Sequence, residues 1–413
     1  MRFSPVLLLL LLLLMRPDGA RAQGSLSGVA LDSVTQQPLA FASVFLANTT
    51  LGVTTTEQGQ FSFPRVPAGN YDVVGSYVGY RLARQSITVT AAAQQLTLRL
   101  APMANRLGEV VVRPNPNRAS DYQKFAELFL GRTTFSRQCR IRNPDDVLVD
   151  FDPETNELTA TAINFVQVDN RALGYRVKYY GLRFSTNFTQ HVVTFYGQPV
   201  FEEMTARNAS QQRRWEANRV AAYHGSLTHF LRSVRAGRVA EEGFTAQRLR
   251  IVDNPRFARA DSLRRQLLHE HLSTAFSRAE QDSIRRWMQV PAAFSMLYTR
   301  LLPVDSLRRV ATGGEPVFLR FRDNLQVSYL REAPDPLYQV RTILPTNAPL
   351  PPAGRQVSQL MLLAREIEIQ PNGQLTNPMA VFTDEYWGFE KMGEFLPVNY
   401  LPPASAAPIP THP

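Results

Sequence analysis

Cysteine, lysine and histidine are scarce in this chain of 413 residues. The single cysteine, Cys139, excludes an internal disulfide and a zinc site built from cysteines, because both need more than one thiolate. Lysine occurs only at Lys124, Lys178 and Lys391, so 42 of the 45 cationic residues are arginines. The six histidines form no His-x-x-Glu pattern with a distant third ligand, so the sequence predicts no metal and no cofactor.

Long apolar runs are also missing, except for one near the N-terminus. The apolar run Val6–Met15 includes eight consecutive leucines and is followed by the small residues of Ala20–Ala22. This pattern, with a positively charged start, is typical of a secretory signal peptide. We therefore expect residues 1–22 to be a signal peptide that is cleaved before Gln23. A membrane anchor is the alternative, but it needs about 20 apolar residues, so we expect no transmembrane helix after cleavage.

The charge balance indicates which partners such a chain meets. Lys+Arg outnumber Asp+Glu by 45 to 35, which gives a net charge of +10. An exported chain rarely meets nucleic acid, so we expect no nucleic-acid partner. An arginine-rich surface favours anionic lipid headgroups, acidic glycans or acidic proteins, although a coding bias toward arginine explains it equally well. The predicted location is the periplasm, the outer membrane or the cell surface, with peripheral membrane association as one option.

Residues 24–113 contain short strand patterns separated by turn residues. Glycine and proline mark turns at Glu57–Gly59 and Pro67–Gly69. About seven strands in about ninety residues are typical of a β-sandwich, in which alternate side chains pack between two sheets. The predicted strands are Ser25–Leu31, Ala42–Leu46, Gln60–Phe63, Tyr71–Val78, Ser86–Val89, Gln95–Leu100 and Glu109–Val112.

The same segment carries a family resemblance. The residues that carry it, in order, are Gly28-Val29, Asp32, Pro38-Leu39, Ala42, Val44, Thr49, Gly52, Thr54-Thr55, Gly59, Phe61, Phe63, Val66-Pro67, Gly69, Tyr71, Ser76, Gly79-Tyr80 and the closing Leu107–Val112. They resemble the carboxypeptidase-regulatory-like domain, which is transthyretin-like in fold and abundant in exported proteins of Bacteroidetes-type bacteria. The resemblance implies no catalytic residues in this domain and no carboxypeptidase activity. A TonB-dependent receptor, which can carry the same domain, needs several hundred more residues.

The rest of the chain mixes helix and strand patterns. Two prolines predict a linker at 114–118, and 119–402 reads as an α+β domain with a largely antiparallel sheet and an unknown role. Residues 403–413 have the composition of a disordered tail. The predicted helices are Tyr122–Leu130, 203–236, one opening at Asn254-Pro255, and one opening with a capping box at Ser277 and Glu280. The predicted strands are Cys139–Arg142, Val147–Phe151, Leu158–Val168, Tyr175–Phe184, His191–Tyr196, Val317–Phe321, Gln326–Leu330, Gln359–Ile369 and Met379–Phe382.

Several groups in this second region contain residue types that occur in metal or catalytic sites, but their spacing does not support such a site. His269 and His271 lie two apart on a predicted helix, so they diverge and cannot share a metal. His224, Ser226 and His229 lack a local acid that would complete a triad. The alternating oxygens of 150–157 resemble a calcium loop without its glycine, so a hairpin tip is favoured. Cys139 is predicted to be a buried thiol.

The remaining candidates are ligand contacts. Aromatic rings at Tyr175, Tyr179 and Tyr180 can stack on sugars, although core packing is the favoured use. With His224 and His229 they are the candidate ligand-contact residues, and no catalytic set is predicted. The leading hypothesis is an exported, non-enzymatic cell-envelope protein with a binding or assembly role, whose partner is an envelope protein or a glycan. The alternatives are an envelope hydrolase with its site in 119–402, and a glycan-binding protein.

Overall fold

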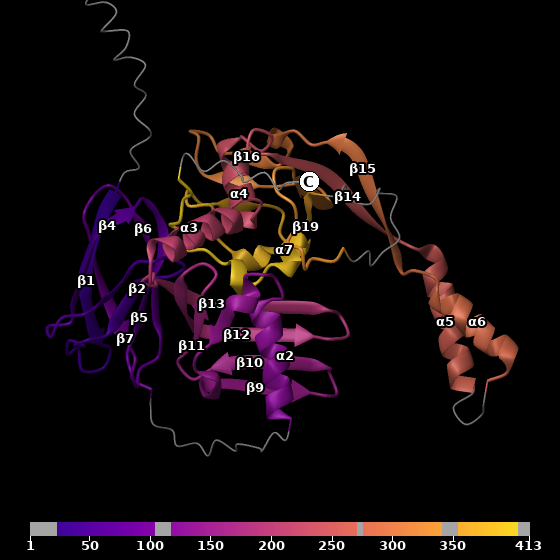
Figure 1. Ribbon diagram of the computed structural model, residues 1–413, viewed down its shortest axis with the longest axis horizontal. Coiled ribbons are helices and arrows are strands. Elements are labelled where there is room, and N and C mark those ends of the chain that lie inside the picture. The colour runs from indigo at the N-terminus through magenta and orange to yellow at the C-terminus, as the bar shows by residue number, and fades with distance from the viewer. Residues whose placement is uncertain (1–22, 104–116, 271–275, 341–353, 404–413) are drawn as a thin grey trace, which may run out of the picture. The chain divides into compact units, whose positions relative to one another are not determined.

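The chain divides into two compact units. The first comprises residues 1–113 with 198–201, and the second comprises 114–197 with 202–413. The computed structural model describes residues 23–103, 117–270, 276–340 and 354–403 (Figure 1). The predicted signal peptide, the strand expected at Glu109–Val112 and residues 404–413 of the predicted tail lie outside the described residues.

The first unit is a sandwich of two sheets, as predicted. One sheet has the order β4-β1-β7, with β1 and β7 parallel, and the other has the order β3-β2-β5-β6. A single core of buried apolar side chains draws on both sheets. The strands are β1 (Gln23–Asp32), β2 (Ser43–Leu46), β3 (Gly52–Thr54), β4 (Gln60–Pro67), β5 (Gly69–Ser76), β6 (Ala83–Val89) and β7 (Gln94–Leu100).

Side-chain alternation and one close backbone approach explain this packing. In β4, Phe61 and Phe63 point into the core, where they are 5% and 3% exposed, while the residues between them face outward. Gly28 pairs with Leu96 of β7, and a Cβ at Gly28 would lie 2.0 Å from the Leu96 carbonyl oxygen. Glycine at this position therefore allows the parallel pairing of β1 with β7.

The second unit begins with a helix and a six-stranded sheet. The helix α2 (Arg118–Leu130) buries Phe125 and Phe129 completely. Their rings pack edge-to-face on Phe184 and Tyr179, at centroid distances of 5.0 and 5.5 Å. The sheet has the order β8-β11-β12-β10-β9, with β13 paired to β12. Its strands are β8 (Cys139–Ile141), β9 (Val147–Asp152), β10 (Glu157–Ala162), β11 (Phe165–Asn170), β12 (Tyr175–Asn187) and β13 (Val192–Glu203).

Two further sheets complete the second unit. The larger has the order β15-β14-β18-β19-β21 and the smaller the order β16-β17-β20. Both share a buried core with α4. The strands are β14 (Phe244–Asp253), β15 (Ala293–Leu301), β16 (Arg308–Val310), β17 (Val317–Leu319), β18 (Asn324–Tyr329), β19 (Gln356–Leu362), β20 (Ile367–Ile369) and β21 (Val381–Glu385), and the helices are α3 (Ala209–Tyr223), α4 (Leu227–Ala236), α5 (Pro255–Glu270), α6 (Arg278–Met288) and α7 (Tyr386–Phe389).

Short 3₁₀ turns connect these elements. They are η1 (Ser136–Gln138), η2 (Pro144–Asp146), η3 (Val304–Ser306), η4 (Pro378–Ala380) and η5 (Met392–Glu394). All strand pairings registered in the second unit are antiparallel, which confirms the predicted α+β class. Within the described ranges, no helix combines the length and apolar character that crossing a membrane requires.

Several predicted elements differ from those in the structure. The helix expected over 203–236 is two helices, α3 and α4, because Gly225 between them has φ +79°, which helical backbone does not allow. The strand expected over Leu158–Val168 is divided into β10 and β11, which pair with opposite sides of β12. Gln359–Ile369 likewise divides into β19 and β20, which lie in different sheets. The strands β3, β14, β15 and β16 were not predicted.

The helices α5 and α6 form a hairpin at the end of the β14–β15 ribbon. They pack on each other, and Figure 1 shows them beyond the end of that ribbon. The predicted capping box is confirmed, because the Ser277 side chain accepts from the Glu280 amide while the Glu280 carboxylate accepts from the Ser277 amide at 2.8 Å. Asn254 likewise caps α5, since its side chain accepts from the Arg256 amide at 3.1 Å.

Candidate functional site

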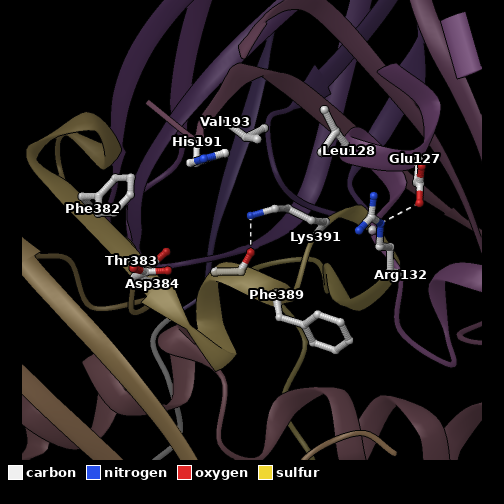
Figure 2. A pocket seen from close by; sticks show the side chains of 12 residues that line it. Glu127, Leu128, Arg132, His191, Val193, Phe382, Thr383, Asp384, Phe389 and Lys391 are labelled. Carbon is white, nitrogen blue, oxygen red and sulfur yellow. Dashed lines mark hydrogen bonds and ion pairs between the residues drawn. The ribbon is translucent and has the colours of Figure 1, made fainter. Parts of the chain in front are cut away.

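An open pocket of about 200 Å³ lies in the second unit, between parts of the chain that are far apart in sequence. Its walls come from the end of α2, the start of β13, and the segment that joins β21 to α7 and continues to Lys391 (Figure 2). The lining residues are Glu127, Leu128, Gly131, Arg132, His191, Val193, Phe382, Thr383, Asp384, Gly388, Phe389 and Lys391. The pocket therefore combines carboxylates, cations and apolar side chains.

The end of α2 is shaped so that Lys391 can approach it. Gly131 follows the last helical residue with φ +93°, and its amide donates to the Glu127 carbonyl at 3.0 Å. A Cβ at Gly131 would lie 2.7 Å from Ser136 Oγ and 3.0 Å from Lys391 Cβ. Any larger residue there would push Lys391 away, so this glycine sets the width of the pocket floor.

Lys391 is held firmly at the pocket. Its Nζ donates to the Gly388 carbonyl, as Figure 2 shows, and its amide donates to Glu394 Oε2 at 3.1 Å. Burial lowers the pKa of the Lys391 ammonium, while the neighbouring carboxyl groups, among them Asp384, oppose that shift. The result is a partly desolvated amine fixed at the wall, which favours a partner that brings a negative charge or a hydrogen-bond acceptor.

Two glutamates, Glu390 and Glu394, lie next to this lysine, and a third, Glu332, lies near Glu390. We call Glu332, Glu390 and Glu394 the carboxyl cluster, because the charges of Glu332 and Glu394 both raise the pKa of Glu390. Burial raises the pKa of Glu332 to about 8 and that of Glu394 to about 7, and it raises the pKa of Glu390 well above its ordinary value. Glu394 also accepts a short hydrogen bond from Thr133 Oγ1. Burial therefore favours the protonated form of these carboxyl groups, while both Glu394 oxygens accept hydrogen bonds, one from Thr133 Oγ1 and one from the Lys391 amide.

The segment before α7 is fixed by a second set of polar contacts. Asp335 accepts from the Thr134 amide at 2.9 Å and from Thr134 Oγ1 at 2.6 Å. The Tyr386 hydroxyl accepts from the Asp335 amide at 3.1 Å, and the Tyr338 hydroxyl donates to Glu385 at 2.8 Å. These bonds hold Glu385 at φ +59°, a value that non-glycine residues rarely adopt. The β21–α7 wall of the pocket is thus preformed.

An ion pair stands at the pocket rim. Arg132 Nε lies 2.6 Å from Glu127 Oε1, and both side chains are largely exposed. Exposed pairs of this kind stabilise a fold by at most about 1 kcal/mol, so both charges remain exchangeable for those of a partner.

The three predicted tyrosines do not line this pocket. Tyr175, Tyr179 and Tyr180 are only 1%, 4% and 6% exposed. Tyr179 packs on α2, and the Arg219 guanidinium lies 4.0 Å above the Tyr175 ring. Stacking on a sugar needs an exposed ring face, so the structure uses these rings for packing, which is the use that the sequence favoured.

The two predicted histidines are also buried, beside the break between α3 and α4. His224 and His229 are 9% and 3% exposed, with ring centroids 5.3 Å apart. His229 Nδ1 accepts from the Gly225 amide at 3.2 Å, and burial lowers the pKa of His229 to about 3, so its ring is neutral. Ser226 Oγ donates to the Tyr223 carbonyl at 2.7 Å, and therefore its proton is not held by a histidine. Ser226 caps α4, and the two histidine rings pack in the core.

The other groups considered from sequence have structural roles. Asp152 accepts from the Glu154 amide and Thr155 Oγ1 at 2.8 and 2.9 Å, which closes the expected hairpin tip and lowers the pKa of Asp152. Burial raises the pKa of the Cys139 thiol, as predicted for an unreactive cysteine. In the described part of the chain, no three His, Cys, Asp or Glu side chains come together as metal ligands. His271 lies outside the described residues.

The pocket residues were not predicted because they come from distant parts of the sequence. Glu127 at the end of α2 and Asp384 in β21, for example, line the same pocket. One signal was available, since Lys391 is one of only three lysines in a chain that otherwise uses arginine.

Comparisons with known proteins cover only part of the chain. No curated protein matches the chain. Among solved structures, catechol 1,2-dioxygenase from Acinetobacter sp. ADP1 is 13% identical with a TM-score of 0.18, over 22% of this chain and 55% of that one. The 5-hydroxyisourate hydrolase of Klebsiella pneumoniae is 23% identical with a TM-score of 0.17, over 19% of this chain and 85% of that one. BcpA, the major pilin subunit of Bacillus cereus, is 16% identical with a TM-score of 0.18, over 20% and 31%.

The chain spans little more than half the length of the first of these solved structures. A family model described as CarboxypepD_reg-like domain matches residues 26–112, which is the segment of the sandwich strands and of the residues that carried the resemblance. Residues 26–112 of this chain therefore form a CarboxypepD_reg-like domain.

Proposed function

We propose that this chain is an exported, non-enzymatic protein of the cell envelope, and that it binds a protein partner through the pocket beside Lys391. The first unit is a CarboxypepD_reg-like domain, which supports a role in binding or assembly. The second unit supplies the binding site. The observation that supports this proposal is the lining of the pocket, which combines positive charges, negative charges and apolar side chains.

The chemistry of the pocket favours a segment of polypeptide. Arg132 and Lys391 provide positive charge, Glu127 and Asp384 provide negative charge, and Phe389 is among the apolar lining residues. A volume of about 200 Å³ accommodates one or two side chains rather than a large cofactor. A protein segment offers both charge signs and apolar side chains together, so it matches this lining.

The reactive side chains of the second unit support binding over catalysis. Lys391 donates its ammonium proton to a backbone carbonyl, and Ser226 donates its hydroxyl proton to another. Cys139 is a protonated thiol because burial raises its pKa. A nucleophile needs an adjacent base that takes its proton, and these three groups instead donate to the main chain or stay protonated.

Export is tested by the mass of the mature chain. We expect intact-mass spectrometry of the protein purified from its native cells to give a chain that begins at Gln23, because the signal-peptidase pattern ends at Ala22. A mature chain that still begins at Met1 would contradict export.

The pocket is tested by photo-crosslinking in intact cells. A photoreactive amino acid at Leu128, which lines the pocket, is expected to capture a defined partner, while the same label at the exposed Leu148 of β9 is not. Asp384→Asn removes one lining charge and keeps the acceptor for the Glu385 amide. It is expected to lower the cross-linked yield about three- to fivefold, the worth of one partly exposed charge pair.

Two results would contradict the proposal. One is equal capture at Leu128 and Leu148, which would show that the pocket is not the binding site. The other is hydrolysis of peptide or glycan substrates by the purified chain, with turnover abolished by Lys391→Met, which would make the pocket an active site.

A further inference from the structure

The arm formed by β14, α5, α6 and β15 carries a large exposed apolar surface. Its exposed large apolar side chains are Ile251, Leu263, Leu268, Met288, Phe294, Met296, Tyr298 and Leu301, with exposed fractions from 38% to 67%. In α5 only Ala260 is buried, and in α6 no residue is. The two helices therefore cover each other only in part, and nothing else in the described second unit buries them.

One face of the β14–β15 ribbon combines apolar side chains with arginine. In β15, Phe294, Met296 and Tyr298 alternate along the strand and share one face, each about two-fifths exposed. Arg250 pairs directly with Met296 across the ribbon, and the Arg248 guanidinium lies 4.9 Å from the Tyr298 ring centroid. We call this the ribbon face. In the described sheet β15 is an edge strand, so its outer edge pairs with no further strand.

The charge of the arm is strongly positive. Residues 248–300 contain ten arginines and five carboxylates, and the exposed residues among them include eight arginines and only three carboxylates. The exposed arginines are Arg250, Arg256, Arg259, Arg265, Arg278, Arg285, Arg286 and Arg300. An occupant that covers this surface must therefore be negatively charged and also accept apolar side chains.

The short helix α6 shows the same combination. Ile284 and Trp287 lie on one side at helical spacing, Met288 at its edge is 67% exposed, and Arg278 and Arg285 lie on the opposite side. A helix with tryptophan and aliphatic residues on one face and arginines on the other is suited to the boundary between lipid headgroups and acyl chains. Long arginine side chains also reach headgroup phosphates while their apolar stems stay at the surface.

We propose that this arm docks on a membrane surface that carries anionic lipids. The apolar side chains of the ribbon face, together with Met288, enter the headgroup region, and the exposed arginines contact lipid phosphates. Each arginine near an anionic surface strengthens association about fivefold, so eight exposed arginines provide ample attraction. This inference concerns a different surface from the pocket beside Lys391 and does not depend on the pocket's partner.

The test is sedimentation of the mature chain, residues 23–413, with lipid vesicles. We expect binding to equimolar phosphatidylcholine–phosphatidylglycerol vesicles at least about tenfold tighter than to phosphatidylcholine alone, and weaker at high salt. The double variant Arg285→Gln/Arg286→Gln is expected to lower binding about tenfold or more. The control Arg81→Gln/Arg99→Gln removes two exposed arginines from the first unit, with the same change in net charge, and is expected to lower it less than about threefold.

A second variant tests the apolar part separately. Phe294→Ser/Met296→Ser replaces exposed side chains, so folding is preserved, and it is expected to abolish the binding that remains at high salt. Absence of vesicle binding would overturn the proposal. Equal losses in the Arg285/Arg286 and Arg81/Arg99 double variants would also overturn it, because binding would then reflect net charge rather than the arm. If the arm variants bind vesicles as well as the wild type does but no longer bind a protein partner, the membrane proposal is overturned and the arm is assigned to protein recognition.

Discussion

Replacement of Arg219 by methionine is expected to lower the free energy of unfolding of the second unit by about 2–3 kcal/mol. Arg219 of α3 is only 6% exposed. Its Nε donates to the Leu173 carbonyl at 2.8 Å and its Nη2 to the Gly174 carbonyl at 3.3 Å, in the turn between β11 and β12. It also lies 3.5 Å from Glu203 and covers the Tyr175 ring. Methionine fills similar space but donates no hydrogen bond, so the Leu173 carbonyl loses its bond from Nε, and the Gly174 carbonyl keeps only its bond from the Met204 amide.

Tryptophan fluorescence isolates this effect. All three tryptophans, Trp215, Trp287 and Trp387, lie in the second unit, so a denaturant titration followed by fluorescence reports that unit alone. The control is Arg214→Met on the same helix, where the side chain is exposed and the change should stay within about 0.5 kcal/mol. Arg219→Lys should recover only part of the loss, because an ammonium lacks the planar fork that serves both carbonyls. Equal effects at positions 214 and 219 would contradict the assigned role.

The second unit is expected to lose stability as the pH rises from about 5 to 8. Burial raises the pKa of Glu332 to about 8 from an ordinary value of 4.5, and Glu332 is 8% exposed. Between these values the folded chain keeps a proton that the unfolded chain has released. Stability therefore decreases with pH, by up to about 1.4 kcal/mol per pH unit for this group alone. Glu390 and Glu394 act in the same direction, since burial raises the pKa of each.

His229 has the opposite effect at lower pH. Burial lowers the pKa of His229 from 6.5 to about 3, so the unfolded chain binds the extra proton in that range. Stability from this group is full above pH 6.5 and is lost as the pH falls toward 3. The two trends together predict a stability maximum in mildly acidic solution, between the unfolded pKa values of glutamate and histidine.

Denaturant titrations at several pH values test this prediction. Glu332→Gln keeps the shape of the side chain and removes its titration, so the fall in stability between pH 5 and 8 should become shallower by up to about 1.4 kcal/mol per unit. Glu154→Gln, at the exposed hairpin tip, is the control and should leave the slope unchanged. A wild-type chain whose stability rises from pH 5 to 8, or identical slopes in Glu332→Gln and the wild type, would contradict the burial of these carboxyl groups.

Local patterns in the sequence determined the first unit. The alternation of Phe61 and Phe63, with turn residues at Gly59 and Gly69, predicted the sandwich, because a two-residue period and positive-φ turns depend on neighbouring residues only. The short strand β3 was missed because three residues show too little periodicity to detect. The Ser277–Glu280 capping box was also predictable, since both partners lie within one helical turn.

Tertiary structure decided where helices and strands divide in the second unit. A Cβ at Gly225 would lie 1.9 Å from Gln356 Oε1, so contact with a distant strand accompanies the break between α3 and α4. For Tyr175, Tyr179 and His229 the sequence favoured packing over ligand contact, but periodicity does not say which apolar face is covered. In the structure α2 and α3 cover the two tyrosines, and His229 is buried among aromatic rings beside the α3–α4 break.

The sequence by itself determined the sandwich, the helix caps and the arginine-rich character of the chain, since composition and short-range spacing carry that information. Only the tertiary structure brought Lys391 and the carboxyl cluster together beside the end of α2, and only it left the arm of α5 and α6 uncovered. The reason is physical: burial, desolvation and exposure depend on contacts between residues far apart in the chain, such as Thr133 and Glu394, and no local pattern encodes them.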